Sequence, residues 1–344
     1  MNKFEIKTDI SKALTMPSTF YTDPQSYQKT INNIFSCSWQ LVTHTSSLKK
    51  NNVYPFTFLN DSLNEPLVIT HNNGTLKCLS NVCTHRAHLV CKNETNSSVL
   101  RCGYHGRTFD LNGTIKAVPG FEGTKDFPSE KDNLQEIQLK NWNEFIFVSL
   151  HSSIKNSSVL EDIEKRLDWF PFDKISYNKK LSKIFYVDAH WALYCENYLE
   201  GMHIPYVHKG LAKEIDCTSY ITELLENGVV QYGESKNNHD KNYAHYYWIF
   251  PNLMLNFYSW GLSINIVEPI SPGKTRIKFL IFPIQGKNPV TEIQELKQVE
   301  FEDETVVKSV QKGIKSLLYS RGRYAPSHEQ GVHYFHQLLS QYIS

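Results

Sequence analysis

The chain has 344 residues, of which 40% are hydrophobic and 21% charged, so it is long enough to form two domains rather than one core. Its 36 basic and 35 acidic side chains leave a formal net charge of +1, which argues against nucleic acid or an anionic membrane as a partner. Neither the first ten residues nor any later apolar run approaches the roughly 20 residues that cross a bilayer. We therefore expect a cytoplasmic protein with no membrane or nucleic-acid partner.

The predicted elements divide the chain into three parts. Residues 1–38 contain one helix, because Thr22 and Asp23 precede Pro24 and apolar residues then recur at helical spacing. Residues 151–344 begin with a polar, Ser-rich stretch and then alternate helical and strand-like patterns, which predicts a mixed α and β part. Between them, an all-β module is predicted from Asn-Gly turns and short apolar runs at Val53–Phe58, Leu67–Thr70, Leu76–Val82, Thr108–Leu111 and Phe145–Leu150.

Two cysteines and two histidines of the β module form the first candidate site. Cys83 and His85 are separated by one residue, and Cys102 and His105 by two, with 16 residues between the pairs. Each arm therefore offers one thiolate and one imidazole, whereas structural zinc sites usually place both Cys in one arm and both His in the other. Mixed arms are typical of a Rieske [2Fe–2S] cluster, in which two Cys hold one iron and two His the other. Structural zinc remains the alternative.

A second candidate site lies in a helical stretch that precedes Pro205. At about 100° per residue, Glu196, Glu200 and His203 share a narrow arc of that predicted helix. Pro205 should end the helix, so that His208 lies beyond the turn and its imidazole can approach that of His203. Two His and a carboxylate with open positions form the facial triad of non-haem Fe(II) oxygenases.

The carboxylate of this triad should come from another element. Residues 302–321 are predicted to form a helix in which Asp303 lies at the centre of the apolar stripe, while Glu302 and Glu304 point about 100° to either side. The stripe consists of Val306, Val307, Val310, Ile314, Leu317 and Leu318. An ionised carboxylate that faces a core is costly unless it is paired or metal-bound, so Asp303 is the predicted third ligand. The alternative is that the acidic residues stabilise the helix N-terminus through its dipole.

An electron-carrying cluster and an open ferrous site together indicate reductive activation of O₂. The sequence resembles the large (alpha) subunit of Rieske non-haem iron oxygenases, an aromatic-ring-hydroxylating dioxygenase-like family, from about Trp39 to His336. Within that family it is most similar to the choline, betaine and carnitine monooxygenase branch. The segments that carry this similarity are Cys83–Ala87, Cys195–Glu200, Pro251–Asn256 and Gly322–Ala325.

The resemblance implies an α+β fold in which an all-β Rieske [2Fe–2S] domain, residues 39–150, is inserted into a helix-grip catalytic domain made of an antiparallel sheet and a long C-terminal helix. Residues 1–38 would be the N-terminal helical part of that catalytic domain, and residues 151–344 would contain its mononuclear iron. The implied cofactors are the Rieske cluster and Fe(II), with NAD(P)H acting indirectly through a reductase. The implied partners are that flavin and iron–sulfur reductase, O₂ and a small-molecule substrate. The resemblance also implies a homotrimer in which the cluster of one subunit passes electrons to the iron of its neighbour.

The resemblance also implies roles for individual residues. Glu200 matches a bridging carboxylate that hydrogen-bonds a cluster His of the adjacent chain and a ligand His; most members have Asp there, and Glu is typical of the carnitine branch. Asn197 matches a residue that lines the iron pocket. Many relatives have Trp at the position of Arg107. The resemblance implies that Arg107 alters either the cluster surface or the reductase-docking face.

The substrate prediction depends on an aromatic-rich region in the C-terminal half. Aromatic faces can cage a quaternary ammonium group, although the same residues are also expected to fill one face of a sheet. We predict hydroxylation of a quaternary ammonium compound of the choline, betaine or carnitine type. The alternatives are aromatic-ring hydroxylation and, from another class, a Rieske electron-transfer protein without a catalytic iron. The aromatic residues are Tyr243, Tyr246, Tyr247, Trp248, Phe250, Phe257, Tyr258 and Trp260.

Overall fold

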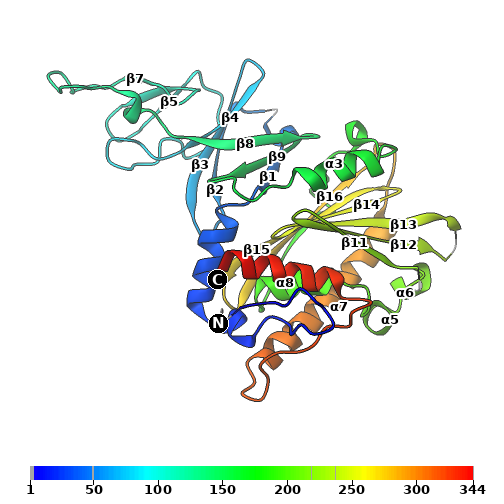
Figure 1. The fold of residues 1–344 in the computed structure, drawn as a ribbon. Coiled ribbons are helices and arrows are strands. Elements are labelled where there is room, and N and C mark those ends of the chain that lie inside the picture. Colours follow the sequence, from blue (N-terminus) through cyan, green and yellow to red (C-terminus); the bar gives the residue numbers. More distant parts are fainter. Residues whose placement is uncertain (1–3, 49, 218, 237, 344) are drawn as a thin grey trace. The chain divides into compact units, whose positions relative to one another are not determined.

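The computed structural model describes residues 4–48, 50–217, 219–236 and 238–343, and over 238–243 it describes the backbone alone. The chain forms two compact units (Figure 1). One unit is Trp39–Ser152, and the other combines Met1–Ser38 with Ser153–Ser344. The first unit is therefore an insertion in the chain of the second.

The inserted unit is built on an antiparallel sheet with the strand order β1-β9-β8-β4-β3-β2. Asn73 and Gly74 form the two-residue turn between β3 and β4 with φ angles of 50° and 80°, the left-handed conformation that such hairpins need. A smaller sheet has the order β5-β6-β7. The strands are β1 (Gln40–His44), β2 (Val53–Phe58), β3 (Glu65–Asn72), β4 (Thr75–Ser80), β5 (Val99–Arg101), β6 (Thr108–Asp110), β7 (Ile115–Ala117), β8 (Glu136–Trp142) and β9 (Phe145–Ser149).

The core of the inserted unit reaches directly under the two Cys-His segments. Val68, Leu79 and Phe109 are completely buried, and the side chains of Cys83 and Cys102 belong to the same apolar cluster. Because both thiols point into this core, the loops that carry them are anchored to the sheets beneath.

The larger unit contains a seven-stranded antiparallel sheet with the order β10-β16-β15-β14-β13-β12-β11. All six residues of β14 are buried, as are the first nine of β15, because both faces of the central strands are covered. The strands are β10 (Lys183–Val187), β11 (Ile221–Leu225), β12 (Gly228–Ser235), β13 (Asn238–Ile249), β14 (Leu253–Tyr258), β15 (Gly261–Ser271) and β16 (Lys274–Pro283).

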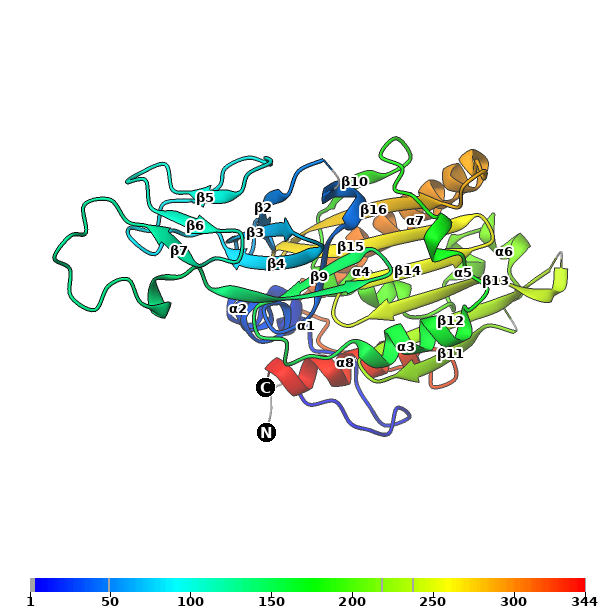
Figure 2. The ribbon, with the colours of Figure 1, turned by 90° about the horizontal axis from the view of Figure 1, so that it is seen from above.

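Helices cover both faces of this sheet. The helices α4 and α7 pack on each other and α4 packs on β15, while α3 lies on the opposite face (Figures 1 and 2). The predicted N-terminal helix begins at Pro24, where the Asp23 carboxylate caps it by accepting from the N–H groups of Gln25 and Ser26. The helices are α1 (Ser18–Thr22), α2 (Pro24–Thr30), a π-helical turn (Ile31–Phe35), α3 (Ser157–Arg166), α4 (Trp191–Tyr198), α5 (Ile204–Val207), α6 (Leu211–Glu214), α7 (Val290–Ile314) and α8 (Gln330–Ile343).

The predicted bounds of two helices are wrong. The helix before Pro205 ends at Tyr198, and Pro205 lies at the start of α5 instead of ending a helix. The long helix runs over Val290–Ile314 rather than 302–321. Leu317 and Leu318, assigned to its apolar stripe, are fully exposed after the helix has ended.

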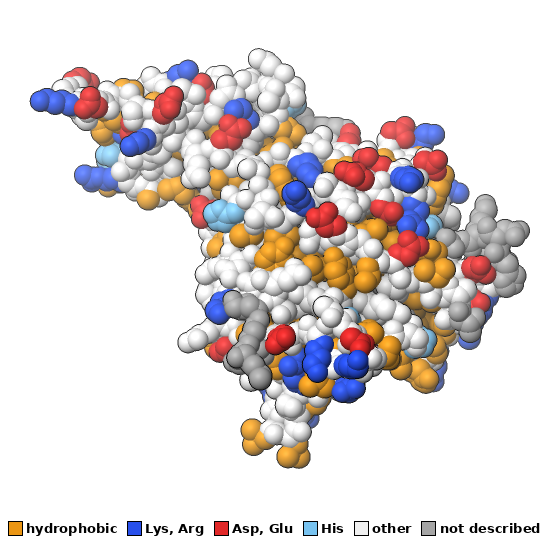
Figure 3. Space-filling model, viewed as in Figure 1, with side chains coloured by type: hydrophobic (Ala, Val, Ile, Leu, Met, Phe, Trp, Pro, Cys, Tyr) orange, Lys and Arg blue, Asp and Glu red, His pale blue; other side chains and the backbone are white. Residues whose placement is uncertain are grey.

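The surface agrees with the small net charge. Acidic and basic side chains are interspersed over the face that Figure 3 presents, without a large field of one sign. Among the helices of the described residues, none combines the length and the apolar composition needed to cross a lipid bilayer.

Candidate metal centres and substrate cavity

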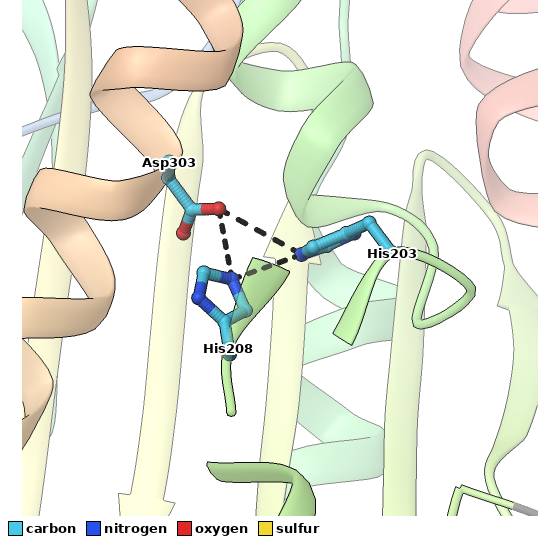
Figure 4. Close-up of side chains that lie close together, drawn as sticks. All are labelled: His203, His208 and Asp303. Carbon is cyan, nitrogen blue, oxygen red and sulfur yellow. Dashed lines mark hydrogen bonds and ion pairs between the residues drawn. The ribbon is translucent and has the colours of Figure 1, made fainter. Parts of the chain in front are cut away.

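Three side chains of the larger unit converge on one point (Figure 4). The Nε2 atoms of His203 and His208 lie 3.1 Å apart. Asp303 Oδ1 lies 3.7 Å from His203 Nε2 and 3.0 Å from His208 Nε2. The structure therefore brings together the two histidines and the distant aspartate that the sequence singles out, with one atom of each facing the same point.

A break in the chain after α4 lets both imidazoles face that point. On a continuous helix, residues five apart would point about 140° away from each other. Instead His203 lies in a turn, His208 caps α5, and Glu200 Oε2 fixes the turn by accepting from the N–H groups of Met202 and of His203, the latter at 3.1 Å. Asp303 reaches the same point from the middle of α7, so the helix-terminus explanation for its charge is wrong.

A carboxylate supports each histidine from behind. Glu200 Oε1 lies 2.6 Å from His203 Nδ1, and Glu302 Oε2 lies 2.8 Å from His208 Nδ1. Burial alone would lower the pKa of His208, but Asp303 and Glu302 raise it above the usual value. With Nδ1 of each ring facing a carboxylate, Nε2 is the atom free to bind a metal. Glu302 was not among the predicted site residues, and only its position beside Asp303 in the sequence hinted at this role.

This arrangement fits a divalent metal ion. Asp303 Oδ1 is buried, and besides the two imidazoles that face it the described residues offer it no hydrogen-bond donor. An acceptor in that state is costly unless a cation binds it. Two imidazole nitrogens and one carboxylate oxygen form the ligand set of a facial triad, so the chemistry of the three atoms matches non-haem Fe(II).

Asn197 and Glu196 occupy different surroundings. Asn197 Nδ2 lies 3.4 Å from His203 Nε2, so Asn197 faces the candidate metal-binding point, the place where His203, His208 and Asp303 converge. Glu196 does not share an arc with Glu200 and His203. Its carboxylate instead accepts from the Tyr21 hydroxyl at 2.7 Å and lies 3.1 Å from His336 Nε2. The sequence prediction of a common arc is wrong because α4 ends before residue 200.

The two Cys-His segments of the inserted unit form loops with the same backbone pattern. The N–H of Cys83 donates to the carbonyl of His88, and the N–H of Ala87 donates back to the carbonyl of Cys83. In the second loop, Cys102 donates to Arg107 and Gly106 donates to Cys102, at the same offsets of five and four residues. Ala87 and Gly106 both have positive φ, 52° and 73°. The two loops therefore present their Cys-His pairs from equivalent backbone settings.

The side chains of these loops lie close together. The rings of His85 and His105 are 4.6 Å apart, and His85 Nδ1 is buried without a hydrogen-bond partner among the described residues. Burial raises the pKa of the Cys83 thiol. Two inward thiols and two neighbouring imidazoles fit a [2Fe–2S] cluster with mixed ligands.

Arg107 is a buried cation beneath these loops. It is 3% exposed, and its Nη1 donates to the hydroxyl of Thr84 at 3.0 Å. Its guanidinium group lies 4.9 Å from the ring centre of Phe121 and 5.1 Å from that of Phe127, and Phe121 also packs on His85. Arg107 thus belongs to the interior support of the ligand loops and not to their surface.

Two adjoining cavities lie next to the histidine–aspartate set. The inner one, about 90 Å³, is bounded by the three converging residues, Glu300 and several tyrosines. The outer one, about 1090 Å³, shares Leu211, Tyr258, Leu296 and Val299 with it. Burial and the neighbouring Asp303 raise the pKa of Glu300 to about 7, despite hydrogen bonds from Tyr194 and Asn265 that lower it.

The aromatic-rich region is divided between the walls of the two cavities and the core. Tyr246 and Tyr258 line the inner cavity, and Phe257 and Trp260 join Tyr258 around the outer one. The side chain of Tyr243 lies outside the described residues. The rest of the region fills the core, because Tyr247, Trp248 and Phe250 are at most 2% exposed.

Sequence comparison places the chain in a family. Residues 161–344 match the ring hydroxylating alpha subunit (catalytic domain), and residues 38–128 match the Rieske [2Fe-2S] domain. The chain belongs to the ring-hydroxylating alpha subunit family. The predicted resemblance is thereby confirmed, and so is the class of enzyme, an oxidoreductase. Alpha subunits of this family contain a Rieske cluster and a mononuclear iron, and they use O₂ and a reductase.

Relatives of this alpha subunit include choline monooxygenase of Amaranthus tricolor, 30% identical over 100% of this chain and 81% of that protein. The carnitine monooxygenase oxygenase subunit of Escherichia coli K12 is 26% identical over 96% of this chain and 94% of its own.

Two solved structures confirm the predicted fold class. The quaternary ammonium Rieske monooxygenase CntA in complex with L-carnitine has a TM-score of 0.80 and 23% identity, covering 98% of this chain and 97% of its own. Naphthalene 1,2-dioxygenase from Rhodococcus sp. has a TM-score of 0.77 and 15% identity, covering 96% of this chain and 94% of its own. An all-β Rieske domain and a helix-and-antiparallel-sheet catalytic domain are common to all three proteins.

Proposed function

We propose that this alpha subunit is the terminal oxygenase component of an enzyme that hydroxylates a quaternary ammonium compound of the choline, betaine or carnitine type. The observation that carries the proposal is the inner cavity, which borders the histidine–aspartate set, has tyrosine walls and contains the Glu300 carboxylate. Tyrosine faces and a carboxylate attract a cation that has no hydrogen to donate. The names of the relatives, choline monooxygenase and carnitine monooxygenase, support the same substrate class.

In this proposal His203, His208 and Asp303 hold Fe(II). Glu200 and Glu302 keep the two rings oriented through Nδ1, which leaves both Nε2 atoms for the metal. When bound, the iron supplies reductive O₂ activation: the substrate C–H bond, O₂, two electrons and two protons give an alcohol and water.

In the inserted unit, Cys83 and Cys102 would hold one iron of the cluster, and His85 and His105 the other. Electrons from NAD(P)H would reach this cluster through a flavin and iron–sulfur reductase. Glu200, already against a ligand histidine at 2.6 Å, would also contact a cluster histidine of the next subunit in a homotrimer. A cytoplasmic location, where such reductases obtain NAD(P)H, completes the proposal.

The protein's own residues would bind and orient the substrate. Tyr198, Tyr246 and Tyr258 form adjoining walls of the inner cavity, with ring centres 6.5 Å and 6.1 Å apart for successive pairs. An ammonium group against these rings would lie in a cavity of only about 90 Å³. Asn197 Nδ2 lies 3.4 Å from His203 Nε2, beside the metal-binding point, and would donate a hydrogen bond to the substrate.

Aromatic-ring hydroxylation is the second candidate, because the fold is shared with naphthalene 1,2-dioxygenase and the same tyrosines would stack on an arene. Substrate-dependent NADH oxidation with a reductase, measured for choline, glycine betaine, carnitine, benzoate and naphthalene, separates the two. We expect product only with ammonium compounds. Turnover of an arene alone would refute the proposal, and His203→Ala, which should lose turnover with an intact cluster spectrum, is the control for the catalytic iron.

A further inference from the structure

Among the residues that the structure describes, the groups that hold Glu300 in place are neutral. Its Oε2 accepts from the hydroxyl of Tyr194, and its Oε1 accepts from Nδ2 of Asn265 at 2.8 Å. Asn265 is itself held by Asn256, whose Nδ2 donates to Asn265 Oδ1 at 3.3 Å. No described Lys, Arg or His forms an ion pair with Glu300. Its carboxylate is therefore fixed at the wall of the inner cavity as an acceptor, and no cationic side chain of the described residues pairs with it.

The described lining of the inner cavity contains no lysine or arginine. Its acidic members are Glu200, Glu300 and Asp303, and its histidines are the two proposed metal ligands. One divalent ion at the metal-binding point does not balance three carboxylates. Glu300 is the remaining one, because Asp303 faces the metal-binding point and Glu200 faces the back of a ligand histidine. A cation that enters this cavity would restore neutrality.

The outer cavity has the same sign. Its described lining has a single lysine, Lys213, against the carboxylates of Glu214, Glu292, Glu295 and Glu302. A substrate that carries a carboxylate at its other end would bring that group into a region where acidic side chains predominate. Like charges in a partly closed cavity repel each other more strongly than in bulk water.

From these observations we infer that Glu300 is the counter-charge of the substrate's ammonium group, and that the cavity selects ammonium compounds with a net positive charge, such as ammonium alcohols, over zwitterions with a carboxylate. This inference rests on the proposed function and narrows it. It assigns Glu300 a specificity-determining role in contact with the substrate, distinct from the metal ligands and from the carboxylates behind them.

Equilibrium binding to the oxidised, iron-loaded protein tests the inference. Isothermal titration calorimetry would compare choline with 3,3-dimethylbutan-1-ol, its uncharged carbon analogue, and with the zwitterions glycine betaine and carnitine. We expect choline to bind at least about 30-fold more tightly than the carbon analogue, the scale of a desolvated charge pair, and at least about tenfold more tightly than either zwitterion. Equal affinities for choline and its carbon analogue, or tighter binding of a zwitterion, would overturn the inference without any variant.

The Glu300→Gln variant then tests the residue itself. It should weaken choline binding by about 30-fold or more and leave binding of the carbon analogue within about threefold. Iron and sulfide content should be unchanged, and loss of iron would instead give Glu300 a metal-binding role and refute the inference. Glu304→Gln, on the same helix but paired with Lys308 and outside both linings, is the matched control and should bind choline as the wild type does.

The outcomes distinguish this inference from the proposed function. If choline and carnitine are both turned over and Glu300→Gln binds them normally, the inference fails and the proposed function stands. If no ammonium compound binds or is turned over, the proposed function fails as well.

Discussion

The Glu302→Ala substitution gives a quantitative test of how the metal-binding point is supported. Glu302 Oε2 lies 2.8 Å from His208 Nδ1, and this contact determines that Nε2 of the same ring faces Asp303, at 3.0 Å. A hydrogen bond to a charged group is worth about 1.5–3 kcal/mol, and each 1.4 kcal/mol is a factor of ten. Removal of the carboxylate should therefore weaken Fe(II) binding by about 10- to 150-fold, which agrees with the usual effect of losing such a partner.

Competition with a chelator of known Fe(II) affinity measures this loss. The visible spectrum of the Rieske cluster provides the internal control, because its proposed ligands belong to the inserted unit and should stay unaffected. Glu302→Gln keeps a hydrogen-bond acceptor and should fall between the wild type and Glu302→Ala. If Glu302→Ala holds Fe(II) as tightly as the wild type, the orienting role derived from the 2.8 Å contact is wrong.

Two further predictions concern other parts of the chain. Arg107→Gln removes a buried positive charge that stacks on Phe121, and Phe121 packs on His85. The midpoint potential of the cluster should therefore fall, because the positive charge favours the reduced cluster. An unchanged or higher potential in a redox titration would contradict this. Arg166 pairs with Asp162 at 3.0 Å and with Glu223 at 2.7 Å. Burial raises the pKa of both carboxyls, but the contact with Arg166 contributes to a net lowering of each. Because folding lowers the pKa of Asp162 and of Glu223, the two ion pairs stabilise the protein above about pH 4, and this stabilisation is lost as the pH falls. Arg166→Met should therefore destabilise the protein near neutral pH and less in acid. Urea unfolding at several pH values would measure the difference, and a constant gap at all pH values would speak against this pairing.

The strands and the ligand loops of the inserted unit could be predicted because their determinants are local. Val53–Phe58 is a strand with the predicted bounds, and Asn73-Gly74 is the predicted hairpin turn. The Cys-His spacing predicted two loops with one Cys and one His each, and each loop closes through hydrogen bonds within six residues.

The helix bounds and part of the site could not be predicted because their determinants are not local. The first half of α7 buries only Ile293, so its sequence lacks the apolar stripe by which helices are recognised. α4 ends at Tyr198 in a turn that Glu200 stabilises with its side chain, which periodicity does not detect. Glu300 in α7 accepts a hydrogen bond from Asn265 in β15. The two residues are 35 positions apart, and neither helical nor strand periodicity in the sequence indicates that they pair.

The central claim is that one chain holds two different iron centres. Iron and acid-labile sulfide analysis of the purified wild-type protein, together with His203→Ala, tests it most directly. The wild type should contain about three irons and two sulfides per chain, and His203→Ala about two of each, because only the mononuclear iron is lost. Zinc in place of iron with no sulfide, or a His203→Ala protein that retains the third iron, would contradict the claim.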